Sequence, residues 1–211
     1  MTASNGARDS DQAVPVLQAA IEQLAHRGYD GVRLRDIAVA AGVSIGSLQH
    51  RFLTRERLLA RACEHHCGEL LESWSRIARA ADDPWRRIEM LIEQLSESPA
   101  LDRRAALWTE LSANAARRPQ LREHLRRVHD AWRSLVLDAV REGTRRGRFR
   151  PVVGEREAVD LLDATIDGAL VAMAGDARHM DGRRLRELAL TAAALALGVG
   201  AAHGSAAASS S

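Results

Sequence analysis

The sequence of 211 residues has no lysine, only two cysteines and few aromatic residues, and each shortage narrows the class of protein. Two cysteines cannot form the disulfide framework that holds small secreted domains together, so we expect a reducing compartment. Strands favour aromatic and β-branched side chains, so an aromatic content of 3% favours helices. The basic residues are all arginine, which we attribute first to codon usage, and a net charge of only +2 gives the whole chain no strong positive field.

The sequence also lacks long apolar runs and the common catalytic motifs. The longest apolar run near the C-terminus, residues 192–199, is far shorter than the roughly 20 residues that cross a membrane. The polar first residues lack the apolar core of a signal peptide. There is no phosphate-binding loop and no Gly-x-Ser-x-Gly nucleophile turn. We therefore expect a cytoplasmic protein with no membrane partner, no cofactor and no enzymatic activity.

Between its ends the chain has the periodicity of an all-α protein with about nine helices. Apolar residues recur every three or four positions, as in the first expected helix, which carries Val14, Leu17 and Leu24. Residues 1–10 are small and polar and residues 200–211 are of low complexity, so we expect both segments to be disordered.

Residues 34–52 have the pattern of a helix-turn-helix. A short helix ends at Gly42, which permits the left-handed backbone that such a turn requires, and Ser44 can cap the helix that follows. Ile37 and Leu48, together with Val43, can form the small core that fixes the crossing angle. The order of these residues therefore predicts a DNA-binding motif.

The face of the second helix opposite this core is polar. It displays Ser47, Gln49, His50 and Arg51, and glutamine can pair with an adenine edge while arginine can contact guanine or a phosphate. Residues 43–61 contain four arginines against one glutamate, so positive charge is concentrated beside this helix. The charge alone is equally typical of a solvated helix face. An alternative function for the chain is a helical adaptor that binds protein.

Residues 19–59, AAIEQLAHRGYDGVRLRDIAVAAGVSIGSLQHRFLTRERLL, resemble the N-terminal domain of TetR-family regulators. The matching positions are Gly28, Tyr29, Ile37, Ala38, Ala41, Gly42, Val43, Ser44, Gly46, Leu48, Phe52 and Leu58. The resemblance implies a DNA-binding domain at residues 11–58 and an effector-binding and dimerisation domain at residues 59–199. It implies DNA contacts by Arg33, Arg35, Ser44, Ile45, Gly46, Ser47, Gln49, His50, Arg51 and Arg55.

Four departures from the family pattern affect the expected DNA contacts. Arg51 stands where the family often has histidine or tyrosine. The family usually has tyrosine at the position of Gln49, so the operator contact is expected to differ there. Val32 and Arg33 replace the usual threonine or serine, which removes a hydroxyl cap but adds a candidate phosphate contact. Arg55 replaces the usual lysine, so its charge and the expected phosphate contact are kept.

The C-terminal region is similar to the subgroup related to the choline-responsive repressor BetI. The similarity rests on Trp108, on the segment GTRRGRFRP at residues 143–151, and on Asp167-Gly168. It implies the architecture but not choline as the ligand. Large side chains and carboxylates that can line an effector pocket are Trp74, Trp85, Trp108, Glu110, Trp132, Asp163 and Asp167. Ordinary core packing is the alternative for each tryptophan.

Two regular apolar stripes near the C-terminus are candidates for a dimer interface. Their small residues allow close approach, and two such helices from each of two chains make a four-helix interface. The expected interface residues are Leu162, Ile166, Ala169, Met173, Leu188, Ala192 and Leu195. Packing inside a single chain is the alternative.

Cys63 and Cys67 lie four residues apart and therefore share one face of a helix. With His66 they resemble part of a zinc site, and an oxidation switch is a second interpretation. No second ligand pair is evident, so we expect no metal site and regard both as structural residues. Taken together, the sequence predicts a homodimeric repressor that binds a palindromic double-stranded operator and is released by a small-molecule effector.

Overall fold

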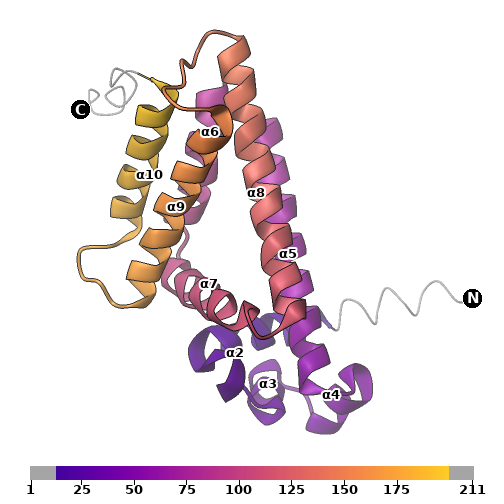
Figure 1. Cartoon of the computed structure of the whole chain (residues 1–211). Coiled ribbons are helices and arrows are strands. Elements are labelled where there is room, and N and C mark those ends of the chain that lie inside the picture. The colour runs from indigo at the N-terminus through magenta and orange to yellow at the C-terminus, as the bar shows by residue number, and fades with distance from the viewer. Residues whose placement is uncertain (1–12, 200–211) are drawn as a thin grey trace, which may run out of the picture. The chain divides into compact units, whose positions relative to one another are not determined.

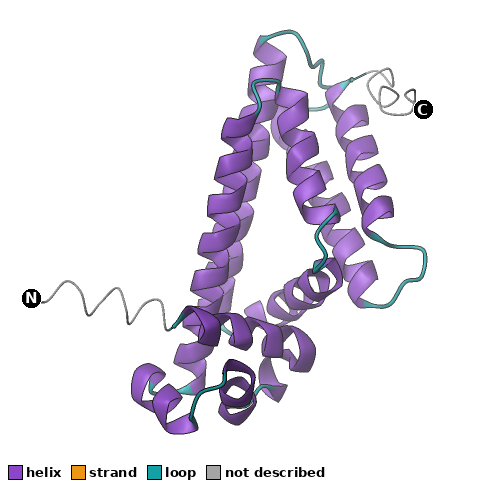
Figure 2. Cartoon of the chain, turned by 180° about the vertical axis from the view of Figure 1, so that it is seen from behind, coloured by secondary structure: helices purple, strands orange, loops and turns teal. Residues whose placement is uncertain are grey.

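The computed structural model describes residues 13–199, and within that range every regular element is a helix (Figures 1 and 2). The predicted disordered segments 1–10 and 200–211 lie outside the described residues. The helices are α2 (Val14–Gly31), α3 (Leu34–Ala41), α4 (Ile45–Phe52), α5 (Arg55–Ala80), α6 (Pro84–Ser96), α7 (Leu101–Ala115), α8 (Pro119–Arg145), α9 (Glu155–Ala174) and α10 (Gly182–Leu197). This arrangement confirms the predicted all-α class, with nine helices in the described part of the chain.

Short polar side chains begin several of these helices, as the sequence predicts. The Ser44 hydroxyl accepts a hydrogen bond from the Ser47 N–H at 3.1 Å, and the Thr54 hydroxyl accepts one from the Arg57 N–H at 3.2 Å. The Asp83 carboxylate caps α6 in the same way, directly before Pro84. Each cap satisfies an amide at a helix start that has no partner within the helix.

The described residues form two compact units, each with contributions from distant parts of the sequence. Unit 1 comprises residues 13–71 and 102–128, and unit 2 comprises residues 72–101 and 129–199. Unit 1 therefore contains α2–α4 together with the first part of α5, most of α7 and the first part of α8. The predicted DNA-binding domain, 11–58, and the predicted effector-binding and dimerisation domain, 59–199, divide the chain by function rather than by contacts, and they stay predictions.

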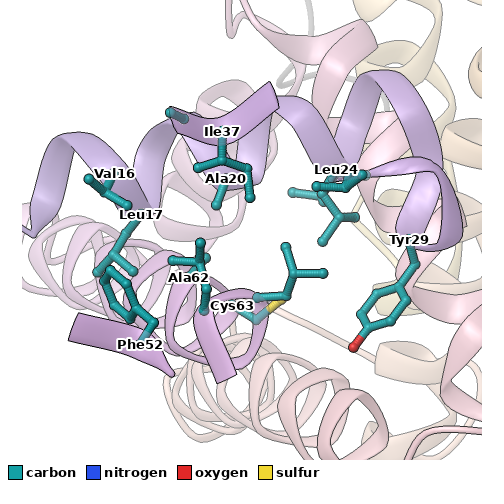
Figure 3. Close-up of a cluster of buried hydrophobic side chains, with 14 of the residues drawn as sticks. Val16, Leu17, Ala20, Leu24, Tyr29, Ile37, Phe52, Ala62 and Cys63 are labelled. Atoms are coloured by element: carbon teal, nitrogen blue, oxygen red, sulfur yellow. The ribbon is translucent and has the colours of Figure 1, made fainter. Parts of the chain in front are cut away.

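The core of unit 1 lies among α2, α3, α4 and α5 and is continued by residues of α7 and α8. Figure 3 shows Val16, Leu17 and Phe52 on one side of this cluster and Leu24 and Tyr29 on the other. Leu24 and Ile37 are fully buried, so α2 and α3 are fixed against the same apolar centre. This packing holds the segment that carries α4.

In unit 2, α10 packs against α9 and α6. The connector after α8 is attached to the end of α10, because the Arg150 N–H donates to the Leu197 carbonyl at 2.9 Å and the Val152 N–H donates to the Ala196 carbonyl at 3.0 Å. In the part of the chain that the structure describes, no helix is both long and apolar enough to cross a membrane.

Candidate nucleic-acid interface

The helices α3 and α4 form the predicted helix-turn-helix. Gly42 leaves α3 with φ 66° and ψ 29°, a left-handed conformation that glycine adopts without steric cost. The Val43 N–H then donates to the Ala38 carbonyl at 3.0 Å, which closes the end of α3. Ile37 and Leu48 are buried beneath the turn, as predicted. The crossing of the two helices is therefore set by local backbone chemistry and by a small apolar core.

The outer surface of α4 is exposed along most of its length. The exposed residues there are Ser44, Ile45, Gly46, Ser47, Gln49 and His50, while Arg51 is half-buried. Arg33 and Arg35, at the start of α3, are also exposed. Asp36 lies 3.9 Å from both Arg27 and Arg35, so one carboxylate restrains two cations beside this surface. Nine of the ten predicted DNA contacts thus lie on α4, at its cap, or at the start of α3.

A strained turn joins α4 to α5. Leu53 has φ 66° and ψ −54°, and the Thr54 N–H donates to the Phe52 carbonyl at 2.7 Å, which together define a γ-turn. Leucine rarely adopts a positive φ, and the side chain gains little from burial because it is 62% exposed. The end of α4 is therefore fixed by a turn that costs energy, a feature typical of functional segments.

Arg55, the tenth predicted contact, points into unit 1. Its guanidinium donates to the Val32 carbonyl at 2.7 Å and to the Tyr29 carbonyl, pairs with Glu56 at 2.9 Å, and lies 5.0 Å from the Tyr29 ring centre. All three nitrogens already have partners, because the chain leaving α2 presents unpaired carbonyls to this side chain. Arg55 therefore positions α2 against α5, and we no longer include it among the proposed phosphate contacts.

Tyr29 is held from a second side by Glu110, which the sequence predicted for the effector pocket, and by Arg118, which it did not single out. The Tyr29 N–H donates to Glu110 Oε1 at 2.6 Å, and Arg118 lies 4.2 Å from the ring centre. Arg118 also pairs with Asp30 at 2.5 Å. Burial raises the pKa of the Tyr29 hydroxyl. We call Tyr29, Asp30, Glu110 and Arg118 the Tyr29 clamp; it connects the end of α2 to α7 and to the start of α8.

Two family profiles match this chain. Residues 16–62 match the bacterial regulatory proteins of the tetR family, and residues 84–198, more than half of the chain, match the C-terminal region of BetI-type transcriptional repressors. The chain belongs to the TetR family. Its C-terminal region is of the BetI type, as the sequence predicted, and both matched families consist of transcriptional regulators rather than enzymes.

Relatives of this TetR-family chain include regulators with different ligands. The transcriptional repressor KstR2 of Mycolicibacterium smegmatis is 26% identical over 64% of this chain and 66% of its own length, just under two thirds. A regulator from Saccharomonospora viridis in complex with choline is 23% identical, with a TM-score of 0.78 and coverage of 85% and 94%. FadR from Bacillus subtilis in complex with stearoyl-CoA is 20% identical, with a TM-score of 0.69 and coverage of 89% and 99%. Both of these structures share the fold of this chain.

The structure brings together only part of the predicted effector pocket. Trp74 and Trp132 pack edge to face in unit 2, with ring centres 5.4 Å apart. Trp85 packs against Phe149 and donates to Glu89 at 2.8 Å, which is ordinary packing with a satisfied indole N–H.

The carboxylates expected in that pocket have other surroundings. Glu110 belongs to the Tyr29 clamp, because its carboxylate is the acceptor for a backbone N–H at the end of α2. Trp108 packs on the core of unit 1. Asp163 pairs with Arg133 at 2.7 Å, and although that pairing lowers the carboxyl pKa, burial is the larger effect and raises it. Asp167 lies on α9, partly exposed.

The predicted dimer stripe on α9 is buried inside this chain. Leu162, Ile166 and Ala169 are between 2% and 6% exposed, so they form the core of unit 2 rather than a free face. Met173 on α9 and Leu188 and Ala192 on α10 are half-buried, and Leu195 is 70% exposed. The exposed apolar residues of α9 are instead Leu161 and Val171, about half exposed, on a neighbouring face.

Cys63 and Cys67 are both buried and unbridged in unit 1. Burial raises the pKa of the Cys63 thiol to about 12 and also raises that of Cys67. A protonated thiol is a poor nucleophile and a poor metal ligand, so the pair acts as a small apolar surface. Among residues 13–199, no group of three metal-ligating side chains is close enough to hold an ion.

Proposed function

We propose that this protein is a homodimeric repressor that inserts α4 into the major groove of its operator. The observation that carries the proposal is the exposed polar face of α4, fixed by the Gly42 turn, the Ser44 cap and the turn at Leu53. Gln49 and Arg51 are the proposed base-reading side chains, with Ser47 and His50 beside them. Arg33 and Arg35 are proposed phosphate contacts that set the register.

The exposed apolar residues of α9 and α10 support a dimer with two-fold symmetry. Leu161, Val171 and Leu195 are large apolar side chains that one chain leaves uncovered. A second copy with the same face would cover them and build a four-helix interface. Two α4 helices would then enter successive major grooves about 34–36 Å apart on a palindromic site.

Release by a small-molecule effector completes the proposal. The Trp74–Trp132 pair is the best candidate for an aromatic wall in unit 2, and the Tyr29 clamp is a candidate link from α7 and α8 to the helix-turn-helix. An effector that favours the wrong spacing of the two α4 helices would weaken DNA binding by the coupling energy, typically about 1–3 kcal/mol. Choline and stearoyl-CoA in the two structural relatives differ so much that the fold does not fix the effector.

The test is a fluorescence-anisotropy titration of the full chain with DNA from upstream of its gene and with scrambled DNA of equal length, at two salt concentrations. We expect a preference of about 10³-fold or more for the specific site. Gln49→Ala and Arg51→Ala should each reduce that preference by about 1–3 kcal/mol. Arg178→Ala, which removes an exposed arginine from the α9–α10 loop, is the matched control. An unchanged preference in the Gln49/Arg51 double variant would refute α4 as the reader.

A further inference from the structure

In unit 1, His66 lies near enough to both Arg104 and His124 to interact with them electrostatically; His124 is buried, and His66 and Arg104 are half-buried. His66 comes from α5, Arg104 from α7 and His124 from α8. His124 is only 3% exposed, and its Nδ1 is buried without a hydrogen-bond partner among the described residues. Buried polar atoms in folded proteins are nearly always paired, so this nitrogen indicates a missing partner.

The neighbours that interact with this group are basic, and two of them have carboxylate partners of their own: Arg103 pairs with Glu22 at 3.0 Å and His65 with Glu69 at 3.5 Å. His66 faces His65 on its own helix, Arg103 and Arg104 on α7, and His124 on α8. His124 in turn faces Arg127. Burial, followed by these cations, lowers the pKa of both His66 and His124 to about 4, and no carboxylate contributes to either shift.

Arg104 has no counter-ion in the described part of the chain. Burial and the neighbouring Arg103 lower its pKa, and among residues 13–199 no hydrogen bond or ion pair involves its guanidinium. Placing a guanidinium in a partly buried position without a negative partner is costly. Arg55 and Arg118, also in unit 1, differ in this respect, since both have acceptors on neighbouring elements.

We propose that His66, Arg104 and His124 bind an anionic group, a carboxylate or a phosphate, of a small-molecule ligand. Arg104 supplies a planar pair of donors that matches either group, and His124 supplies a donor from its unpaired nitrogen when it is protonated. An anion beside His124 favours the charged form of the imidazole, so binding should be accompanied by proton uptake. The ligand acts as the effector only if the proposed repressor function holds, whereas anion binding itself does not depend on it.

A metal ion or an organic cation does not fit this group. Arg104 and its cationic neighbours repel a second positive charge, and among residues 13–199 no group of three metal-ligating side chains could hold an ion. A purely structural pair of histidines would be expected to have its buried nitrogens hydrogen-bonded. The positive charge and the unpaired nitrogen together favour an anion.

The test measures thermal stability and calorimetric binding of the full chain with sodium octanoate and with inorganic phosphate, at constant ionic strength. Octan-1-ol and choline chloride are the matched neutral and cationic probes. We expect one or both anions to raise the Tm and neither control to do so. Octanoate alone would identify a carboxylate, phosphate alone a phosphate ester, and both a general anion site.

Three variants locate the effect. Arg104→Gln should weaken anion binding by about tenfold or more, as loss of a charge-assisted pair predicts, and Arg104→Lys should restore part of it. His124→Gln should reduce the rise in affinity that wild type shows between pH 8 and pH 6. Arg178→Gln controls for net charge. Equal responses to anions and controls, or full binding by folded Arg104→Gln, would overturn the proposal.

Operator binding is measured separately in the same preparations. If neither anion binds and specific DNA binding is the same with and without them, the anion site is refuted and the repressor proposal is retained. Anion binding without any preference for upstream DNA would support the site and count against the repressor.

Discussion

The α3–α4 pair and the α9–α10 pair are both helical hairpins on a buried apolar core, but their outer faces have opposite chemistry. The exposed face of α4 carries serine, glutamine and histidine, whereas α9 and α10 expose Leu161, Val171 and Leu195. DNA is recognised by hydrogen-bonding side chains, and obligate homodimers by apolar ones. The exposed residues, and not the buried cores, therefore distinguish the proposed DNA-binding surface from the proposed dimer surface.

The largest expected effect comes from charging the apolar face. Leu195→Arg should convert the proposed dimer to a monomer without unfolding the chain, because the side chain is 70% exposed in the single chain. Loss of the second binding unit should weaken operator binding by about 10²–10⁴-fold. Analytical ultracentrifugation and anisotropy measure the two effects. Val152→Arg, at an equally exposed position outside α9 and α10, is the control, and a dimeric Leu195→Arg would contradict the assignment.

The two hairpins also differ in how well the sequence predicts them. Gly42, Ser44 and Thr54 act on residues within four positions, so the turn and the caps of α3–α5 are predictable locally. On α9, apolar and small residues occupy more than one face, so periodicity cannot distinguish the buried stripe of Leu162 from the exposed one of Leu161.

Contacts between residues far apart in the sequence could not be predicted either, because no local pattern indicates them. Glu110 and Tyr29 are 81 residues apart, and nothing near Glu110 indicates that it accepts a hydrogen bond from the end of α2. Arg55 was expected to face DNA because charge gives no direction for a long side chain, and only the fold shows the carbonyls that it reaches. Local motifs were therefore predictable and the contacts that hold them in place were not.

Acid should destabilise the protein through its interior rather than through either outer face. His66 and His124 have folded-state pKa values of about 4 against an ordinary 6.5, so the unfolded chain binds protons first as pH falls. Their contribution is complete above about pH 6.5 and is lost towards pH 4. The loss should approach about 3 kcal/mol for His124 and be smaller for the more exposed His66. Urea unfolding at a series of pH values measures it.

Replacing His124 assigns that pH dependence. His124→Gln should flatten the profile between pH 6.5 and pH 4. Arg178→Gln, in the exposed α9–α10 loop, should leave it unchanged. A profile that keeps its slope in folded His124→Gln would exclude His124 as the titrating group.

Removing the clamp carboxylate tests how the DNA-reading hairpin is held. Glu110→Ala leaves the Tyr29 N–H without its acceptor and should cost about 1–3 kcal/mol of unfolding free energy. Glu22→Ala, which removes only an exposed ion pair with Arg103 at 3.0 Å, should cost less than about 1 kcal/mol. Chemical denaturation of both variants gives the comparison. Equal losses would mean that the clamp contributes no more than a surface pair.

The smallest expected effect concerns the one large apolar side chain on the polar face of α4. Ile45 is the first residue of the helix and is 44% exposed, and the first residues of a recognition helix contact base edges. An exposed isoleucine there fits the methyl group of thymine.

Replacing the contacted thymine by deoxyuridine removes one methyl group and should weaken operator binding by the wild-type protein by about 0.8 kcal/mol. Anisotropy on operators substituted one thymine at a time measures the effect. Ile45→Ala should bind both operators alike, while Val39→Ala, at an even more exposed position on α3, should keep the wild-type difference. If the difference persists in Ile45→Ala and disappears in Val39→Ala, the methyl is read from α3, and the polar face of α4 works without its apolar residue.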